Sequence, residues 1–239
     1  MELTRTFQGK GDVFDQKYPF YSIIEVASNN DPEVVPEDSE RLLEFIDLVG
    51  DHVKDGVVPQ GEAQSQQIWE LRENIALAAT KYGYTLKYDV SLPTDSFYKI
   101  VNETRSVINN SAEFTQSEKD AVVTTGYGHI GDGNLHLNIS LPGYSDPDMQ
   151  EKLSRVVEPY VMNFVKNARG SISAEHGIGF QKASFLEYSK SKAMIEYMKR
   201  IKQVFDPNGI MNPYKVLPNE WPIDIILSIS IFLKIYNIL

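Results

Sequence analysis

The fold of this 239-residue chain depends most on the stretch GHIGDGNLHLNIS, residues 128–140. Residues 134–140 alternate polar and apolar side chains, which is typical of a β-strand with one face in the core. Residues 121–127 predict a second strand, and only a short glycine-rich gap separates the two. Because a gap of this length joins neighbouring strands as a hairpin, the two strands are expected to pair antiparallel.

Other segments extend this pattern in both directions along the chain. Residues 84–92 alternate in the same way and predict a third strand. Further strands are predicted at 21–27, 53–59 and 171–174, and helices at 40–49, 65–82, 94–109, 146–168 and 190–205. This mixture favours an α+β fold, with a largely antiparallel sheet covered by helices on one face. A doubly wound parallel sheet is the lesser alternative, because no GxGxxG turn leads from a strand into a helix and no P-loop is present.

Composition narrows the range of functions. The chain has a formal net charge of −10 and no lysine–arginine cluster, which argues against nucleic-acid binding. It has no cysteine, which excludes disulfides, thiolate metal sites and cysteine nucleophiles. The N-terminal residues show neither a secretory signal nor a transit-peptide pattern. The charge-free stretch 225–233 is far shorter than the ~20 residues that span a bilayer, so a membrane partner is not expected.

Three of the four histidines lie in glycine-flanked polar motifs. The glycine-rich turn can bring His129 beside His136, which lies on the polar face of its strand. The motif SAEHGIG adds Glu175 and His176. Two imidazoles and a carboxylate with open positions form a catalytic arrangement for zinc or a similar divalent ion, and His176 is then available as a base. The alternative, that these are hydrogen-bonded surface histidines, stays open at this point.

Two basic residues are candidates for binding an anionic substrate. Arg72 lies at the margin of the apolar stripe of its predicted helix, and Lys87 lies on the polar face of its predicted strand. A guanidinium can hold a carboxylate by a two-pronged contact. For each residue taken alone, the alternative is a charge that only faces solvent.

Five motifs in unbroken order resemble the C-terminal half of the flavin-dependent D-2-hydroxy acid dehydrogenases, flavoproteins of the vanillyl-alcohol-oxidase type. The resemblance covers roughly residues 18–218. It is closest to the enzymes that oxidise D-2-hydroxyglutarate, followed by those that oxidise D-lactate. The motifs that carry it are WELRENI (69–75), YTLKYDVSLP (84–93), GYGHIGDGNLHLNI (126–139), SAEHGIG (173–179) and FDPNGIMNPYKVLP (205–218).

The resemblance implies a ligand set and a base. In the family, the positions of His129, His136 and Glu175 hold a divalent metal, commonly zinc. The position of His176 matches the base that removes the proton of the substrate hydroxyl. The cofactor is FAD, which receives the hydride, and Asn212 matches a position near the flavin ring, with Glu175 also facing the cofactor side.

The resemblance also implies a substrate site. Arg72, Lys87 and Asn138 match contacts to the substrate carboxylates. The expected substrate is a small 2-hydroxy acid, with D-2-hydroxyglutarate favoured and D-lactate as the alternative. Ala76 stands where the hydroxyglutarate enzymes have Thr, one turn beyond Arg72, and this departure weakens the case for hydroxyglutarate.

The family pattern divides the chain into parts. Residues 1–170 are expected to form a ferredoxin-like cap domain that binds substrate and metal, and residues 171–218 a helical segment that packs on a flavin domain. Residues 219–239 form a hydrophobic tail with no family counterpart. The family's FAD-binding domain precedes this segment and is not expected within the chain, so the isolated chain is expected to be incomplete as an enzyme.

Three functions follow as hypotheses. The leading one is the C-terminal part of an FAD-dependent dehydrogenase that needs an FAD-binding domain and an electron acceptor. The second is a self-sufficient metal hydrolase that uses His129, His136 and Glu175. The third is a non-catalytic module that docks on a separate flavin subunit. The resemblance implies a mitochondrial location, and a cytoplasmic one is the alternative.

Overall fold

The structure is a computed structural model, and it describes residues 13–26 and 35–218. The chain divides into two compact units, residues 1–81 and residues 82–239. None of the helices in the described ranges is both long and apolar enough to cross a membrane.

The boundary between the two units lies inside the segment 1–170, which is expected to form one cap domain. The extent of that domain therefore stays a prediction, as does the docking role of residues 171–218. The hydrophobic tail expected at 219–239 lies outside the described residues.

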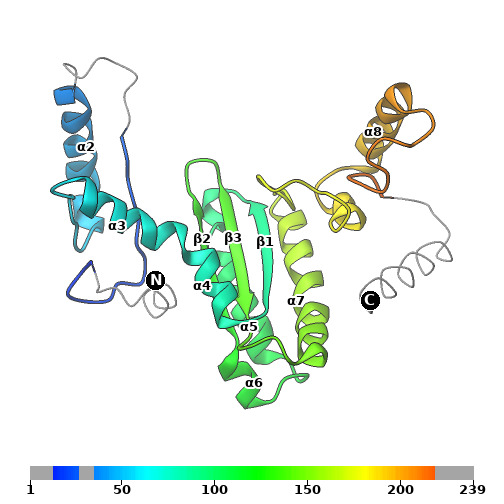
Figure 1. Ribbon diagram of the computed structural model, residues 1–239, viewed down its shortest axis with the longest axis horizontal. Helices are drawn as coiled ribbons and strands as arrows, with labels where there is room; N and C mark the ends of the chain where they lie inside the picture. Colours follow the sequence, from blue (N-terminus) through cyan, green and yellow to red (C-terminus); the bar gives the residue numbers. More distant parts are fainter. Residues whose placement is uncertain (1–12, 27–34, 219–239) are drawn as a thin grey trace, which may run out of the picture. The chain divides into compact units, whose positions relative to one another are not determined.

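The first unit is helical. Its elements are α2 (Val35–Val49), a 3-10 turn η2 (Gly50–His52), α3 (Glu62–Glu73) and α4 (Ile75–Tyr82), the last of which ends one residue into the second unit (Figure 1). The helix expected at 65–82 is divided at Asn74, whose side-chain amide donates to the Glu70 carbonyl at 2.8 Å. Asparagine competes in this way with the regular hydrogen bonds of a helix.

Two predicted strands are absent from the described part of the first unit. Residues 21–26 and 53–59 form no strand. Their apolar side chains, such as Ile24 and Val58, are exposed and have no core face to pack against. An apolar run has the propensity for a strand, but a strand also needs a neighbour to complete its hydrogen-bond ladder.

The second unit contains a three-stranded sheet. Its strands are β1 (Thr85–Ser91), β2 (Val123–His129) and β3 (Asn134–Ser140), in the order β1-β3-β2 with both pairs antiparallel. The expected α+β fold with an antiparallel sheet is confirmed, and the alternative of a doubly wound parallel sheet is wrong. The strand expected at 171–174 is reduced to a single bridge between Ser171 and Ser91.

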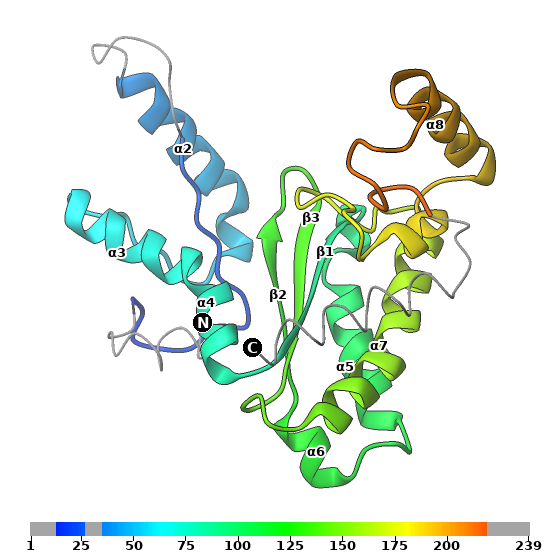
Figure 2. The same ribbon diagram turned by 45° about the vertical axis from the view of Figure 1, so that its right-hand side comes forward.

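Two long helices cover one face of this sheet. They are α5 (Lys99–Asn110), preceded by the 3-10 turn η3 (Thr94–Ser96), and α7 (Pro147–Asn167). Figures 1 and 2 show them side by side on the same side of the strands, where α5 contacts β2 and α7 contacts β1. The short helix α6 (Gln116–Ala121) leads into β2 behind a capping box of Thr115 and Glu118.

The core lies between these helices and the sheet. It is built from the inward side chains of both layers, including Val90, Leu135, Leu137, Ile139, Ile100, Val101, Leu153, Val157 and Val161, each of which is fully buried. Because side chains alternate along a strand, burying Leu135, Leu137 and Ile139 turns Asn134, His136 and Asn138 to the opposite face. The helices on one side thus determine which residues of β3 face away from them.

The end of the described chain is less tightly packed. It comprises the 3-10 helix η4 (Ala183–Tyr188) and α8 (Lys192–Phe205). Of the apolar residues along α8, only Ile195 is buried, whereas Met194, Tyr197 and Ile201 are exposed. An amphipathic helix normally covers its apolar face, so α8 offers an apolar surface within the described part of this unit.

Candidate metal centre

The face of the sheet opposite α5 and α7 is polar, and strand register decides which side chains meet there. His136 on β3 lies opposite Asp89 on β1 and opposite Tyr127 on β2. Two neighbouring rows across the sheet therefore carry polar side chains: Asp89, His136 and Tyr127 in one, and Lys87, Asn138 and Thr125 in the next.

The hairpin between β2 and β3 places His129. This residue ends β2, and its ring centroid lies 6.2 Å from that of His136. The turn depends on Gly133, which has a φ of 72° and whose added Cβ would lie 2.5 Å from the Leu92 carbonyl oxygen. Only glycine fits a left-handed backbone this close to another chain segment. The tight turn therefore brings the two imidazoles beside each other.

A single carboxylate holds the segment that carries Glu175 and His176. Asp89 is 2% exposed, and its Oδ2 accepts hydrogen bonds from the backbone N–H groups of Ala174, Glu175 and His176 at 3.1, 3.0 and 2.8 Å. The Ser173 hydroxyl donates to the same oxygen at 3.2 Å. Figure 2 shows this segment, in yellow, beside the ends of β1 and β3.

The hydrogen bonds also keep Asp89 ionised. Burial acts to raise the pKa of its carboxyl group, because a charge is poorly solvated in the protein interior. The hydrogen bonds from the backbone N–H groups of His176 and Glu175, together with the nearby side chains of His176 and Lys182, outweigh burial and leave the pKa below its ordinary value. A negative charge therefore persists under the site at neutral pH.

Four potential ligand atoms converge at this position, one of them from Asp89 itself. His136 Nε2 lies 3.1 Å from Glu175 Oε1, and His136 Nδ1 lies 3.8 Å from Asp89 Oδ1. The ring of His176 stacks on that of His136 with centroids 5.4 Å apart, and its Nε2 lies 3.6 Å from Glu175 Oε1. One ligand atom from each of these four residues lies within 4.8 Å of the others.

The chemistry of this cluster fits a divalent cation. Imidazole nitrogens and carboxylate oxygens are the usual ligands of zinc and similar ions, and two of each are present. Asp89 Oδ1 is buried and makes no hydrogen bond among the described residues, so it lacks the partner that buried polar atoms normally have. His129 is not one of the four, but its ring lies next to that of His136.

The remaining candidate residues lie on other positions of the sheet and on a helix of the first unit. Asn138 is buried one row along the sheet, where its amide donates to the Tyr127 hydroxyl at 3.4 Å, and Lys87 is exposed on the strand beside it. Arg72 lies on α3 in the first unit. Its participation in the site stays a prediction.

Asn212 lies beyond α8 and has a left-handed backbone with a φ of 47°. Among the described residues, its side chain interacts with Lys215 rather than with the cluster. The same segment is joined to the motif that carries His176, because the Val216 N–H donates to the Gly179 carbonyl at 2.7 Å. Its proximity to a flavin stays a prediction.

Sequence reasoning missed Asp89 and Tyr127 as members of the site. The signal for Asp89 was present, since it lies two residues after Lys87 and so shares its face of the strand. Nothing in the sequence indicated that a loop more than 80 residues away would fold onto that carboxylate. Tyr127 could have been found from the register of the hairpin, which places it opposite His136.

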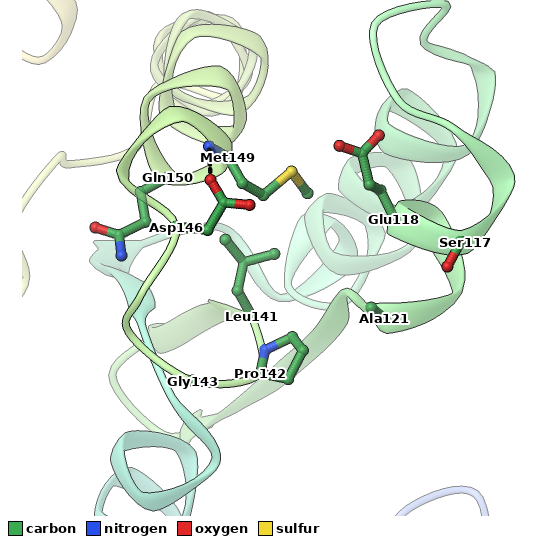
Figure 3. A pocket seen from close by; sticks show the side chains of 9 residues that line it. All are labelled: Ser117, Glu118, Ala121, Leu141, Pro142, Gly143, Asp146, Met149 and Gln150. Carbon is green, nitrogen blue, oxygen red and sulfur yellow. Dashed lines mark hydrogen bonds between the residues drawn. The ribbon is translucent and has the colours of Figure 1, made fainter.

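A separate cavity of about 200 Å³ lies where β3 ends and α7 begins (Figure 3). It is lined by polar and apolar residues of α6, α7 and the loop after β3, and its acidic side chains already have local roles. Asp146 accepts from the Met149 N–H at the start of α7, and Glu118 is paired with Lys152. The cavity shares no residue with the metal cluster, and we assign no function to it.

Comparison with known proteins shows which family the chain resembles. Residues 1–216 match a family described as FAD linked oxidases, C-terminal domain. The chain is 43% identical over 203 residues to mitochondrial D-2-hydroxyglutarate dehydrogenase of Arabidopsis thaliana, and 40% identical over 207 residues to that of Bos taurus. It is also 39% identical over 217 residues to a putative mitochondrial D-lactate dehydrogenase of Schizosaccharomyces pombe.

These matches cover most of this chain but a minor part of each relative. They include 84%, 86% and 89% of the chain, and 33%, 35% and 40% of the three relatives in the same order. The chain thus spans between a third and two fifths of the length of these proteins.

Proposed function

Because the chain belongs to the family of C-terminal domains of FAD-linked oxidases, we propose that it forms the metal- and substrate-binding part of a D-2-hydroxy acid dehydrogenase. The observation that carries this proposal is the convergence of His136, Glu175 and His176 above the buried carboxylate of Asp89. The favoured substrate is D-2-hydroxyglutarate, because two relatives described above are named for it, and D-lactate is the second candidate.

His129, His136 and Glu175 are the residues proposed to hold the divalent ion, with zinc as the expected metal. The contribution of such an ion is Lewis-acid polarisation, which lowers the pKa of a hydroxyl group and fixes its orientation. His136 Nε2 and Glu175 Oε1 lie 3.1 Å apart, which supports the binding of one metal ion by both residues. Two acceptor atoms that face each other at this distance need a cation or a proton between them.

His176 is the residue proposed to accept the proton of the substrate hydroxyl. Its side chain is 61% exposed and lies on the Glu175 side of His136, so it is accessible to a molecule bound above the cluster. A well-placed general base accelerates a reaction by roughly 10²–10⁴-fold. The chemistry proposed for FAD is uptake of the hydride from the substrate carbon.

Lys87 and Asn138 are proposed to bind a substrate carboxylate. They lie opposite each other on β1 and β3, one row away from Asp89 and His136. An ammonium group and an amide in the row next to a metal centre suit a carboxylate attached to the reacting carbon. Arg72 is proposed as a further carboxylate contact, which fits a dicarboxylic acid better than lactate.

The flavin itself is proposed to be supplied by an FAD-binding domain outside these 239 residues. The exposed apolar side chains of α8, including Met194, Tyr197 and Ile201, support a docking role for the segment 171–218. Asn212 is proposed to lie near the flavin ring in that assembly, and an electron acceptor is required to reoxidise the flavin. A mitochondrial location is proposed because the relatives are named as mitochondrial.

Metal binding by the 239-residue chain tests the proposal. Zn²⁺ titrated in competition with a chromophoric chelator should occupy a single site per chain. His136→Ala should abolish that site, whereas His52→Ala, a matched change in the first unit, should leave it intact. Zn²⁺ affinity that is the same in the wild type and in His136→Ala would contradict the proposed centre.

Calorimetry on the zinc-loaded chain then tests the substrate. D-2-hydroxyglutarate should bind more tightly than D-lactate and more tightly than its own L-enantiomer, and Lys87→Met should weaken it. The reverse order of the two acids would assign the alternative substrate. Dye reduction with D-2-hydroxyglutarate and added FAD should be negligible for this chain alone, and rapid turnover would contradict the need for a separate flavin domain.

A further inference from the structure

The two oxygen atoms of the buried Asp89 carboxylate have different neighbours. We propose that Asp89 is the positioning residue of the centre: one oxygen holds the Ser173–Gly177 loop, and the other orients His136 for metal binding. This inference rests on the proposed function, because it assigns Asp89 a role toward the metal described there. Asp89 acts through His136 and the loop, and it is not proposed to contact the substrate or the flavin.

Several contacts join the loop to the rest of the second unit, and those of the Glu175 and His176 backbones go to Asp89. Residues 172–182 contain no helix or strand, yet Glu175 and His176 must keep their positions relative to His136. Their own backbone N–H groups both donate to Asp89 Oδ2, so each residue is fixed at its backbone. Convergence of several donors on one charged oxygen makes this a strong anchor, since hydrogen bonds to ionised groups are about twice as strong as neutral ones.

The other oxygen of Asp89 faces the histidine of the sheet. Asp89 Oδ1 lies 3.8 Å from His136 Nδ1, too far for a hydrogen bond, and it makes none with any other described residue. A histidine that binds a metal through one nitrogen normally donates its other N–H to a carboxylate or carbonyl, which fixes the ring. A small shift would give Asp89 Oδ1 that hydrogen bond while Nε2 faces Glu175.

The ring of His136 is already confined in the other directions. Tyr127 lies on one side with its ring centroid 5.0 Å away, and His176 stacks 5.4 Å away. Packing therefore restrains the plane of the imidazole, and its orientation within that plane is left to the groups that face its two nitrogens. Those groups are Asp89 and Glu175.

A carboxylate suits this position because donors approach it from both sides. When His136 Nε2 binds the metal, Nδ1 carries the proton, so Asp89 faces N–H groups at both oxygens. An asparagine can accept on one side only, and its NH₂ group must oppose a donor on the other. Without metal, the proton of His136 can move to Nε2, and an asparagine can then satisfy the loop and donate to Nδ1.

Asp89→Asn thus separates positioning from simple structural support. Its metal-free form should unfold at nearly the wild-type temperature, but its affinity for Zn²⁺ should fall by about 10–100-fold, as is typical when a supporting partner of a metal ligand is lost. Asp206→Asn is the matched control. Asp206 is also buried and accepts backbone N–H bonds, from Ile210 and Met211, and none of its described contacts is a histidine.

The experiment is chelator competition for Zn²⁺ with the full chain, combined with amide hydrogen exchange. We expect slow exchange at Glu175 and His176 in the wild type, fast exchange there in Asp89→Ala, and an affinity loss in Asp89→Asn but not in Asp206→Asn. Equal affinity of wild type and Asp89→Asn would overturn the inference. Fast exchange at both amides in the wild type would overturn it without any variant.

Failure of the proposed function gives a different result. If the wild-type chain takes up no Zn²⁺, the metal centre itself is wrong, whatever Asp89 does. If the wild type binds Zn²⁺ and Asp89→Asn binds it equally well, the centre survives and only the positioning role is lost.

Discussion

The sheet half of the site, Asp89 with His136, is held by strand pairing, whereas the loop half, Glu175 with His176, lies in a segment without helix or strand. The sheet half is also the more buried: the side chain of Asp89 is 2% exposed, and that of Glu175 is 49% exposed. The two halves are joined by backbone N–H groups of the loop, which donate to the carboxylate of the sheet half.

This difference predicts how substitutions in each half affect the stability of the fold and the affinity for metal. Strand positions are fixed by many backbone hydrogen bonds and by the core behind them, so damage there should reduce both the stability of the fold and metal affinity. Loop positions depend on a few hydrogen bonds, several of which go to Asp89, so damage there should reduce metal affinity with little loss of global stability.

The largest expected effect is on the sheet half. Leu137 is fully buried behind His136, and Leu137→Ala should lower the free energy of unfolding by about 2–5 kcal/mol because it leaves a cavity in the core. Urea unfolding of the second unit measures this effect. Val204→Ala on the exposed side of α8 should change stability by less than about 0.5 kcal/mol. Equal effects of the two variants would show that the sheet does not control stability.

The next effect concerns the turn between the two histidine-bearing strands. Gly133→Ala should cost about 1–3 kcal/mol, because φ is positive there and the added methyl group meets the Leu92 carbonyl oxygen. It should also weaken Zn²⁺ binding by displacing His129. Gly131→Ala is a control two residues away, where an added Cβ has open space. A loss in Gly131→Ala as large as in Gly133→Ala would refute the role of the close approach.

A smaller effect is expected in the loop half. Ser173→Ala removes a hydroxyl group that donates to Asp89 or to the Gly177 carbonyl, which should cost about 0.5–1.5 kcal/mol locally. Hydrogen exchange at Glu175 and His176 should accelerate, while the urea midpoint stays close to that of the wild type. Ser184→Ala, at an exposed position of η4, serves as the control. A large fall in the urea midpoint would show that the loop is part of the cooperative core.

The sheet half was the more predictable of the two. The alternation of residues 84–92 and 134–140 indicated β1 and β3 to within a residue of their ends, because one face of each is buried. The same reasoning wrongly predicted strands at 53–59 and, within the described residues, at 21–26. Local sequence shows the propensity for an extended chain, but it does not show whether a neighbouring strand is available to pair with it.

For the loop half, the sequence predicted the residues of the motif but not their position in the fold. Glycines beside Glu175 and His176 indicated a polar turn, and the family pattern indicated a metal site, but the anchor at Asp89 was not foreseen. That contact joins residues 87 positions apart, and neither periodicity nor capping rules relate such residues. The helix break at Asn74 was missed for a different reason, since a single Asn can continue a helix or end it through its own side chain.

The smallest expected effect concerns an ion pair that supports the sheet from outside the site. Glu118 on α6 pairs with Lys152 on α7, just before the chain enters β2. Hydrogen bonds from Lys152 and Thr115 lower the pKa of the Glu118 carboxyl to about 2. A lowered pKa adds stability above the ordinary pKa of 4.5, and that stability is lost as the pH falls toward about 2. The stability difference between wild type and Glu118→Gln, measured by urea unfolding, should therefore be constant near neutral pH and shrink across that range. It should be smaller at every pH when Lys152 is replaced by Met, because the pair is then already broken. A difference that does not change with pH would mean that packing around Glu118, rather than its charge, supports the sheet half.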